Sequence, residues 1–152
     1  MERLPYIYVK AAVDCATLRR ALPERWTIDV PRYLMRHSGP MPGDGVLPAA
    51  YASTLTVEHG AYLIRVVDDF GALAATGRIT FDAGTAVYDR IETTEPHRRQ
   101  GLASTVMLTL DQLATEAGIT ERLLVATEAG ASLYTRLGWH HLAPFSTALL
   151  PN

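Results

Sequence analysis

The decisive stretch of this sequence is Thr94-Glu95-Pro96-His97-Arg98-Arg99-Gln100-Gly101-Leu102-Ala103-Ser104, which lies between a β-branched run and a long amphipathic pattern. Its position predicts a turn from a strand into a helix. Two small residues, Gly101 and Ala103, fall where the helix begins. There the first N–H groups have no partner within the helix, and the helix dipole adds partial positive charge. Because glycine also lets a phosphate approach the backbone closely, the turn is predicted to bind an anion.

A second motif follows further along the chain and reads Ala131-Ser132-Leu133-Tyr134-Thr135-Arg136-Leu137-Gly138-Trp139. Together with Arg98-x-x-Gly101-x-Ala103, it resembles the GNAT superfamily of acyl-CoA-dependent N-acetyltransferases. Members carry R/Q-x-x-G-x-G/A at the start of a central helix, then a short helix reading roughly A-x-x-L-Y-x-x-L-G-F/W. The resemblance is specific over Tyr88 to Trp139. It implies an α/β fold, with a mixed, mainly antiparallel sheet that has a splayed central parallel strand pair and is flanked by helices.

Length and composition predict one domain over residues 1–152, because a chain of this size supports a single core. The formal net charge of −2 argues against broad binding to nucleic acid. Cys15 is the only cysteine, so neither an internal disulfide nor a cysteine zinc cluster is predicted. The start lacks the long apolar stretch of a signal peptide, and no apolar run approaches the ~20 residues of a membrane span. The expected location is the cytoplasm, with no membrane partner.

Residues before the turn predict a strand, two helices and a loop. The strand spans Tyr6–Lys10, and the helices span Ala12–Leu22 and Val30–His37, with Pro31 at the first position of the second. The Gly/Pro-rich loop Ser38–Gly45 is interpreted either as a surface connection or as a segment that faces the acceptor.

The remaining elements follow the order that the resemblance implies. Gly77 lies inside a predicted strand and indicates a bulge or a close backbone approach. A helix separates two of the strands, which are therefore predicted to be parallel. The expected strands are Tyr62–Val67, Leu73–Phe81, Thr85–Thr93, Arg122–Ala126, Trp139–Leu142 and Phe145–Leu150, and the expected helices are Arg99–Ala117 and Ala129–Leu137.

The turn is predicted to hold the pyrophosphate of acetyl-CoA through backbone N–H groups, with Arg98 or Arg99 adding positive charge. By resemblance, the N–H of Thr93 binds the thioester oxygen, a modest oxyanion-type role. Many relatives have an asparagine after the strand that precedes the second helix, and it contacts the pantetheine. This chain has no asparagine there, and Thr127 is the candidate to replace that contact. The backbone N–H groups predicted to bind the pyrophosphate are those of Arg99, Gln100, Gly101, Leu102, Ala103 and Ser104.

Tyr134 is the main candidate for catalysis. A phenol with a pKa of ~10 can protonate a thiolate whose conjugate acid lies near ~8.5, as acyl transfer from CoA requires. In the resembled family this tyrosine points from the short helix toward the CoA sulfur. The alternative is a core aromatic that packs beside Leu133 and Leu137.

Asp89 is the candidate base. In a regular strand Asp89 shares a face with Val87, Ile91 and Thr93, and a carboxylate on an otherwise apolar face is desolvated and becomes a better proton acceptor. An ion pair with a neighbouring arginine, such as Arg90, is the alternative, and a bulge would exchange the two faces. Glu92, or no dedicated base, also stays open.

No metal is expected, because the adjacent His140 and His141 point to opposite faces of a strand and lack a third ligand at helical spacing. The resemblance implies transfer of an acetyl group from acetyl-CoA to a primary amine, by direct attack in a ternary complex. A small-molecule amine is the expected acceptor, with no nucleic-acid partner, and homodimer formation stays open. The rival hypotheses are an acyl-CoA-binding sensor or interaction module without catalysis, and an unrelated phosphate-binding α/β protein.

Overall fold

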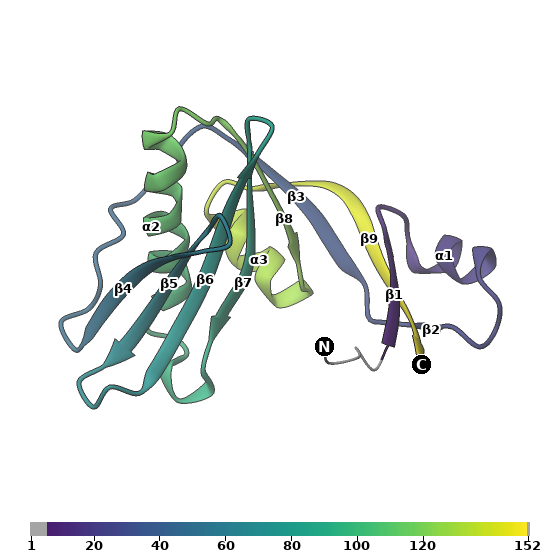
Figure 1. The fold of residues 1–152 in the computed structure, drawn as a ribbon, viewed down its shortest axis with the longest axis horizontal. Helices are drawn as coiled ribbons and strands as arrows, with labels where there is room; N and C mark the ends of the chain where they lie inside the picture. The colour runs from purple at the N-terminus through teal and green to yellow at the C-terminus, as the bar shows by residue number, and fades with distance from the viewer. Residues whose placement is uncertain (1–5, 152) are drawn as a thin grey trace.

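The computed structural model describes residues 6–151 of the chain. Strands and helices alternate irregularly before the long central helix and regularly after it (Figure 1). In chain order the elements are β1 (Tyr6–Ala11), α1 (Cys15–Ala21), β2 (Thr27–Ile28), β3 (Arg32–Ser38), β4 (Tyr51–Glu58), β5 (Ala61–Asp68), β6 (Leu73–Asp82), β7 (Thr85–Thr93), the 3-10 turn η1 (Glu95–His97), α2 (Leu102–Glu116), β8 (Glu121–Ala126), α3 (Glu128–Arg136) and β9 (His140–Pro151).

One mixed sheet organises the fold. Its strand order is β1-β9-β3-β8-β7-β6-β5-β4, and β2 pairs with β9 beside this path. Strands β4 to β7 form an antiparallel meander, whereas β7 and β8 are parallel, with α2 crossing over between them. The mixed, mainly antiparallel sheet with one parallel pair confirms the predicted fold class, including the parallel pairing across the central helix.

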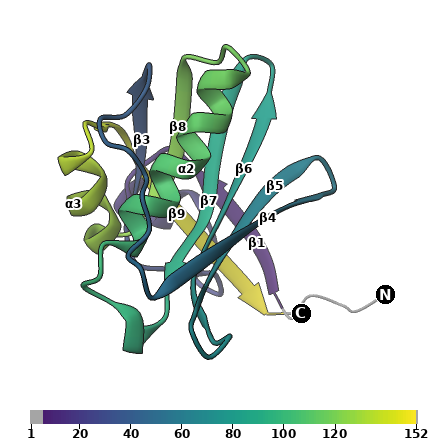
Figure 2. The same cartoon turned by 90° about the vertical axis from the view of Figure 1, so that its left-hand side faces the viewer.

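Helix α2 covers one face of the meander (Figure 2). Its buried residues include Leu102, Val106 and Leu110, whose spacing places them on one side of the helix. Gly77 of β6 lets the helix come this close, because a Cβ there would overlap Val106 and lie 3.1 Å from Leu110 Cδ1. The pairing of β6 with β7 also shifts register opposite Gly77. Of the two alternatives predicted at Gly77, the close approach is present, whereas the bulge lies opposite Gly77 in β7.

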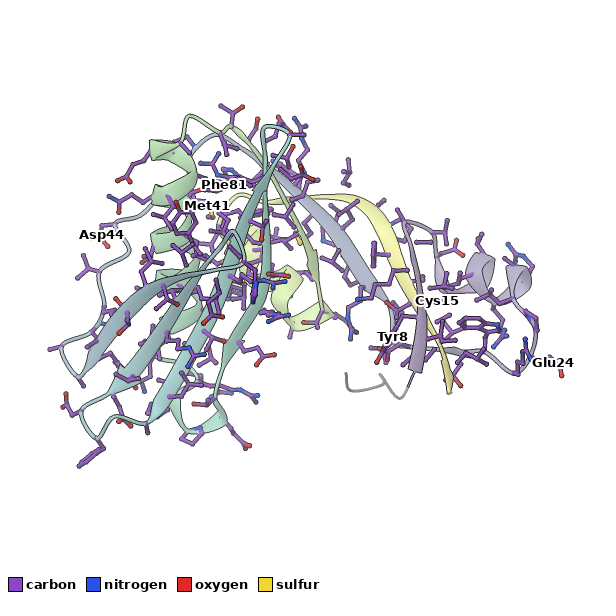
Figure 3. The ribbon with its side chains drawn as sticks, in the orientation of Figure 1. Tyr8, Cys15, Glu24, Met41, Asp44 and Phe81 are labelled. Carbon is purple, nitrogen blue, oxygen red and sulfur yellow. The ribbon has the colours of Figure 1, made fainter. Side chains whose placement is uncertain are left out.

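The N-terminal elements form an arm that extends away from α2 (Figure 1). Strand β9 begins beside β3 and ends between β1 and β2, so a single strand links the two parts. The hydroxyl of Ser146 in β9 donates to the carbonyl of Val13 at 2.6 Å, which holds the start of α1 against the strand. Figure 3 places Cys15 in this arm, far from Met41 and Phe81 beside α2.

The helix predicted over Val30–His37 is wrong, because Arg32–Ser38 form strand β3. Met35 and His37 are buried and Arg36 between them is exposed, which is the period-two pattern of a strand. Both edges of β3 are paired, one with β8 and the other with β9. These long-range hydrogen bonds outweigh the weak local preference for a helix.

The end of the chain also differs from the prediction. The two strands expected at Trp139–Leu142 and Phe145–Leu150 are one strand, β9, and a register shift opposite Leu34 and Met35 absorbs the irregularity. No strand was expected at Tyr51–Glu58, which form β4. Seven of the eight residues of β4 are exposed, so its pattern lacks the buried alternation that identifies a strand in sequence.

A buried ion pair joins α2 to β8. Arg122 is fully buried, and its Nε donates to the carboxylate of Asp111. The same carboxylate accepts from the backbone N–H of Met41 at 2.9 Å and from the hydroxyl of Tyr88 at 3.1 Å. The loop Ser38–Gly45 is thus anchored on α2. This contact is compatible with both interpretations of the loop, which stay predictions.

Candidate active site

A large cavity, with a volume of about 710 Å³, lies where β7, the start of α2 and α3 meet. Of the residues predicted to bind the cofactor, Thr93, Arg98, Arg99, Leu102, Ala103 and Thr127 line it. Gln100, Gly101 and Ser104 belong to the same turn but do not line the cavity. Four further lining residues were not predicted from the sequence, because they have no polar side chain: Ile91, Ala129, Gly130 and Leu133.

The turn before α2 presents free backbone donors. The first intrahelical bond runs from the N–H of Thr105 to the carbonyl of Gly101 at 3.1 Å, so the N–H groups of the three preceding residues are left over. Gly101 adopts φ +73°, and Arg99 adopts φ +64°, a conformation that is uncommon for a residue with a side chain. The Nε of Arg98 donates to the carbonyl of Thr93 at 3.4 Å, which holds the turn against the end of β7.

A chain of three side chains fixes the turn from its other side, and sequence analysis missed it. The hydroxyl of Tyr51 lies 2.9 Å from Nδ1 of His97, and Nε2 of His97 lies 3.4 Å from the carboxylate of Asp68. An imidazole that donates from Nε2 to Asp68 can accept at Nδ1 from Tyr51, so one neutral tautomer satisfies both contacts. His97 directly precedes Arg98, and the contacts therefore tie the anion-binding turn to β4 and β5.

Strands β7 and β8 separate beside this cavity. Their parallel pairing ends at Tyr88 and Leu124, although β7 continues to Thr93 and β8 to Ala126. The N–H of Thr94 donates to Ala74 of β6 at 2.9 Å. Because hydrogen bonds alternate along an antiparallel pair, the N–H of Thr93 points away from β6 and into the gap. This is the position that the predicted contact with a thioester oxygen requires.

Tyr134 faces the same gap from α3. Its side chain is 7% exposed, and burial raises the pKa of Tyr134 to about 12. Within residues 6–151 its hydroxyl makes no hydrogen bond, yet the residue lines the cavity. A Cβ at Gly130 would lie 3.2 Å from the ring, so a glycine there lets Tyr134 lie close to the helix backbone. The hydroxyl of Thr127, which accepts from the N–H of Gly130, caps the same helix.

A bulge in β7 changes the environment that was predicted for Asp89. Arg90 adopts φ +54°, and the pairing with β6 shifts register at this point. The expectation that Asp89 shares a face with Ile91 and Thr93 is therefore wrong. Asp89 is partly exposed and forms a two-pronged ion pair with Arg78, not with Arg90. The hydrogen bond to Asp89 raises the pKa of the Arg78 guanidinium.

Glu92 differs from Asp89, which also lines the passage between β7 and β8, in having no such ion pair among the described residues. Its carboxylate has no hydrogen-bond or ion-pair partner within residues 6–151. It also lines three cavities, which are the large one, a passage of about 200 Å³ between β7 and β8, and a third of about 200 Å³ on the sheet face away from α2. Tyr134 lines the first two of them. Glu92 is thus common to the linings of all three cavities.

Within residues 6–151 there is no group of three or more His, Cys, Asp or Glu side chains that could hold a metal ion. His141 packs its ring against Tyr33 at 5.1 Å between centroids. None of the helices in this described part is long and apolar enough to span a membrane.

Comparison with known structures shows the same architecture in other proteins. A GCN5-related N-acetyltransferase from Kribbella flavida aligns with a TM-score of 0.64 and 20% identity, over 84% of this chain and 60% of that one. A GCN5-related N-acetyltransferase from Sphaerobacter thermophilus aligns with a TM-score of 0.71 and 14% identity, over 96% of this chain and 60% of that one. A GCN5-related N-acetyltransferase-like protein from Streptococcus suis aligns with a TM-score of 0.62 and 14% identity, over 90% of this chain and 67% of that one. The chain thus spans about 60% of the length of the first two proteins, and these identities speak for the fold alone.

A comparison with curated proteins gave no match. The model of the Acetyltransferase (GNAT) family, by contrast, matches residues 18–139, which include the anion-binding turn, the separated strands and the helix that carries Tyr134. The match covers most of the chain. The fold of the chain also aligns with those of the solved acetyltransferases. The chain belongs to the GNAT family of acetyltransferases.

Proposed function

We propose that the protein transfers an acetyl group from acetyl-CoA to the primary amine of a small acceptor, by direct attack within a ternary complex. The pyrophosphate of acetyl-CoA lies against the free N–H groups at the start of α2, with the guanidinium of Arg99 beside it. The thioester enters the gap between β7 and β8, where the N–H of Thr93 hydrogen-bonds the carbonyl oxygen.

The amine reaches the thioester from the third cavity, on the sheet face away from α2. Glu92 takes a proton from the ammonium group, and the neutral amine attacks the carbonyl carbon. The resulting intermediate carries negative charge on its oxygen beside Thr93. When it collapses, the C–S bond breaks and the sulfur leaves, taking up the proton of Tyr134. The nitrogen gives up its second proton, which restores the Tyr134 phenol and leaves the neutral amide.

Tyr134 assists the departure of the thiolate. With its pKa raised to about 12, the phenol stays protonated at neutral pH and is available as a hydrogen-bond donor. Its proton passes to the sulfur as the C–S bond breaks, since the desolvation that raises the pKa of Tyr134 also makes a bare thiolate unfavourable in the same gap.

The observation that carries this proposal is the meeting of three features at one cavity. A carboxylate and a phenol that have no partner among residues 6–151 lie at the separation of β7 from β8, and the cavity there extends to the start of α2. A purely structural tyrosine and glutamate would not need a shared opening of this kind.

Thermal denaturation with acetyl-CoA tests cofactor binding. At 100 times Kd the ligand stabilises the fold by about 2.7 kcal/mol, which raises the Tm by roughly 5–10 °C for a chain of this size. Ala103→Glu places a carboxylate among the N–H donors and should abolish the shift. Ala117→Glu, at the exposed far end of the same helix, is the matched control and should retain it. A shift that survives Ala103→Glu would refute this binding mode.

Release of free CoA thiol in the presence of amines tests catalysis. Tyr134→Phe keeps the ring and removes the hydroxyl, and should lower kcat by about 10²-fold or more while the acetyl-CoA shift remains. Turnover that is unaffected by this change would remove the role of Tyr134. Binding without turnover on any amine would instead favour a CoA-binding sensor.

A further inference from the structure

The third cavity has a charge pattern that the reaction itself does not require. It lies on the sheet face away from α2, and three arginines from three adjacent strands line it, Arg65 of β5, Arg78 of β6 and Arg90 of β7. Asp89 neutralises Arg78. Within residues 6–151, Arg65 and Arg90 make no side-chain hydrogen bond or ion pair with another residue.

The register of the strands arranges these charges. Arg65 pairs with Thr76, and Thr76 pairs with Glu92, so the three form a row across β5, β6 and β7. Neighbouring strands lie about 4.8 Å apart, so the backbone positions of Arg65 and Glu92 are separated by roughly 10 Å. A cation therefore stands at one end of the row, and a carboxylate with no partner among residues 6–151 stands at the other. The small hydroxyl side chain of Thr76 lies between them.

The bulge adds the second cation to this row. Arg90 is the extra residue of β7, and the hydroxyl of Thr76 donates to its carbonyl at 3.3 Å. Arg90 holds φ +54°, a conformation that a residue with a side chain adopts at some cost and that is found at sites where a bulge redirects a side chain. Arg90 and Glu92 line both the passage between β7 and β8 and the third cavity. Two members of the charged set, Arg90 and Glu92, thus also border the place where the thioester would lie.

We infer that the acceptor is a small amine that also carries an anionic group, a carboxylate or a phosphate. This inference rests on the proposed acetyl transfer. The amine lies at Glu92, facing the thioester, and the anionic group lies over Thr76 between the guanidinium groups of Arg65 and Arg90. Guanidinium groups bind carboxylate and phosphate oxygens through paired, charge-assisted hydrogen bonds, which sets both the charge and the orientation of the acceptor.

The size of the third cavity agrees with a small acceptor. At about 200 Å³, it holds the volume of about seven water molecules of ~30 Å³ each. An amino acid fits such a space, with its side chain extending out through the open side, whereas a folded peptide segment does not. A polyamine has the right reactive group, but its remaining cations would meet Arg65 and Arg90.

Matched pairs of acceptors test the inference. One arm compares the twenty common amino acids with their α-carboxamides, and the other compares glucosamine 6-phosphate with glucosamine. Spermidine serves as a cationic reference. The inference expects at least one anionic acceptor to exceed its neutral partner in kcat/KM by about 10-fold or more. The arm that responds distinguishes a carboxylate from a phosphate.

Two variants then assign the effect to the arginines. Arg65→Gln and Arg90→Asn each remove one cation, and asparagine tolerates the positive φ at position 90. Each should raise KM for the anionic acceptor by about 10–100-fold, leave KM for its neutral partner unchanged and leave kcat nearly unchanged. Arg25→Gln, an exposed arginine between α1 and β2, is the matched control and should change none of these values.

The outcomes separate this inference from the proposed function. Loss of the acetyl-CoA thermal shift and of all thiol release would overturn both. Two outcomes with an intact acetyl-CoA thermal shift would overturn the inference alone. In the first, neutral amines or spermidine reach the kcat/KM of the best anionic acceptor. In the second, no anionic acceptor is turned over. It would also fail if Arg65→Gln and Arg90→Asn raised KM equally for anionic and neutral acceptors.

Discussion

Replacing Glu92 with glutamine gives a sharp test of the mechanism, because it removes the proton acceptor and keeps the shape of the side chain. A general base in position contributes typically 10²–10⁴ to the rate, so kcat of Glu92→Gln should fall by about that factor, equivalent to about 3–5 kcal/mol of activation free energy. Glu92 has no partner within residues 6–151. The free energy of unfolding should therefore change by about 0.5 kcal/mol or less.

Asp89→Asn is the matched comparison on the same strand. Asp89 is held by Arg78 in a pair whose side chains are 41% and 27% exposed. Breaking a partly exposed pair of this kind costs about 1 kcal/mol or less of stability. Asp89 lines the passage between β7 and β8, but its carboxylate is already neutralised by Arg78, so kcat of Asp89→Asn should stay within about threefold of the unaltered protein.

The assay is the initial rate of thiol release at saturating acetyl-CoA and acceptor, with urea denaturation of each variant to separate rate from stability. A hundredfold loss in Asp89→Asn, together with full activity in Glu92→Gln, would refute the assignment of the base and restore Asp89. Full activity in both variants would show that no dedicated base is needed, the third alternative that the sequence leaves open.

Three further changes test the parts that support the site. Asp111→Ala leaves the guanidinium of Arg122 buried without its partner and should cost about 3–5 kcal/mol in urea denaturation; a loss below about 1 kcal/mol would contradict the importance of this pair. His97→Ala releases the turn from Tyr51 and should raise the Kd for acetyl-CoA by about 10-fold in calorimetric titration, and an unchanged Kd would show that the turn is rigid without it. Because the pKa of Tyr134 is about 12 in the folded state and 10 in the unfolded state, stability is intact below pH 10 and is lost as the pH rises toward 12. At pH 11 this loss is about 1.4 kcal/mol, and Tyr134→Phe should abolish that share of the decline in urea midpoints measured at pH 9, 10 and 11.

The candidate site divides between residues that a local pattern reveals and residues that it does not. The start of α2 and the helix of Tyr134 follow from small residues, caps and periodicity within short segments, so their positions are predictable from sequence. The bulge at Arg90 has no such signal, since an arginine is not a typical residue for positive φ. The bulge places Asp89 on the opposite face of the strand from Ile91 and Thr93, where its carboxylate forms an ion pair with Arg78.

The sequence by itself determined the family, the parallel crossover around α2 and the turn that presents free N–H groups, because these features depend on residues close together in the chain. The tertiary structure alone decided that Arg32–Ser38 form a strand between β8 and β9, and that Tyr51 and Asp68 hold His97. It also decided that Glu92 lines all three cavities. The physical reason is that pairing register and side-chain contacts between distant segments depend on the whole sheet, where long-range hydrogen bonds and burial override local preference.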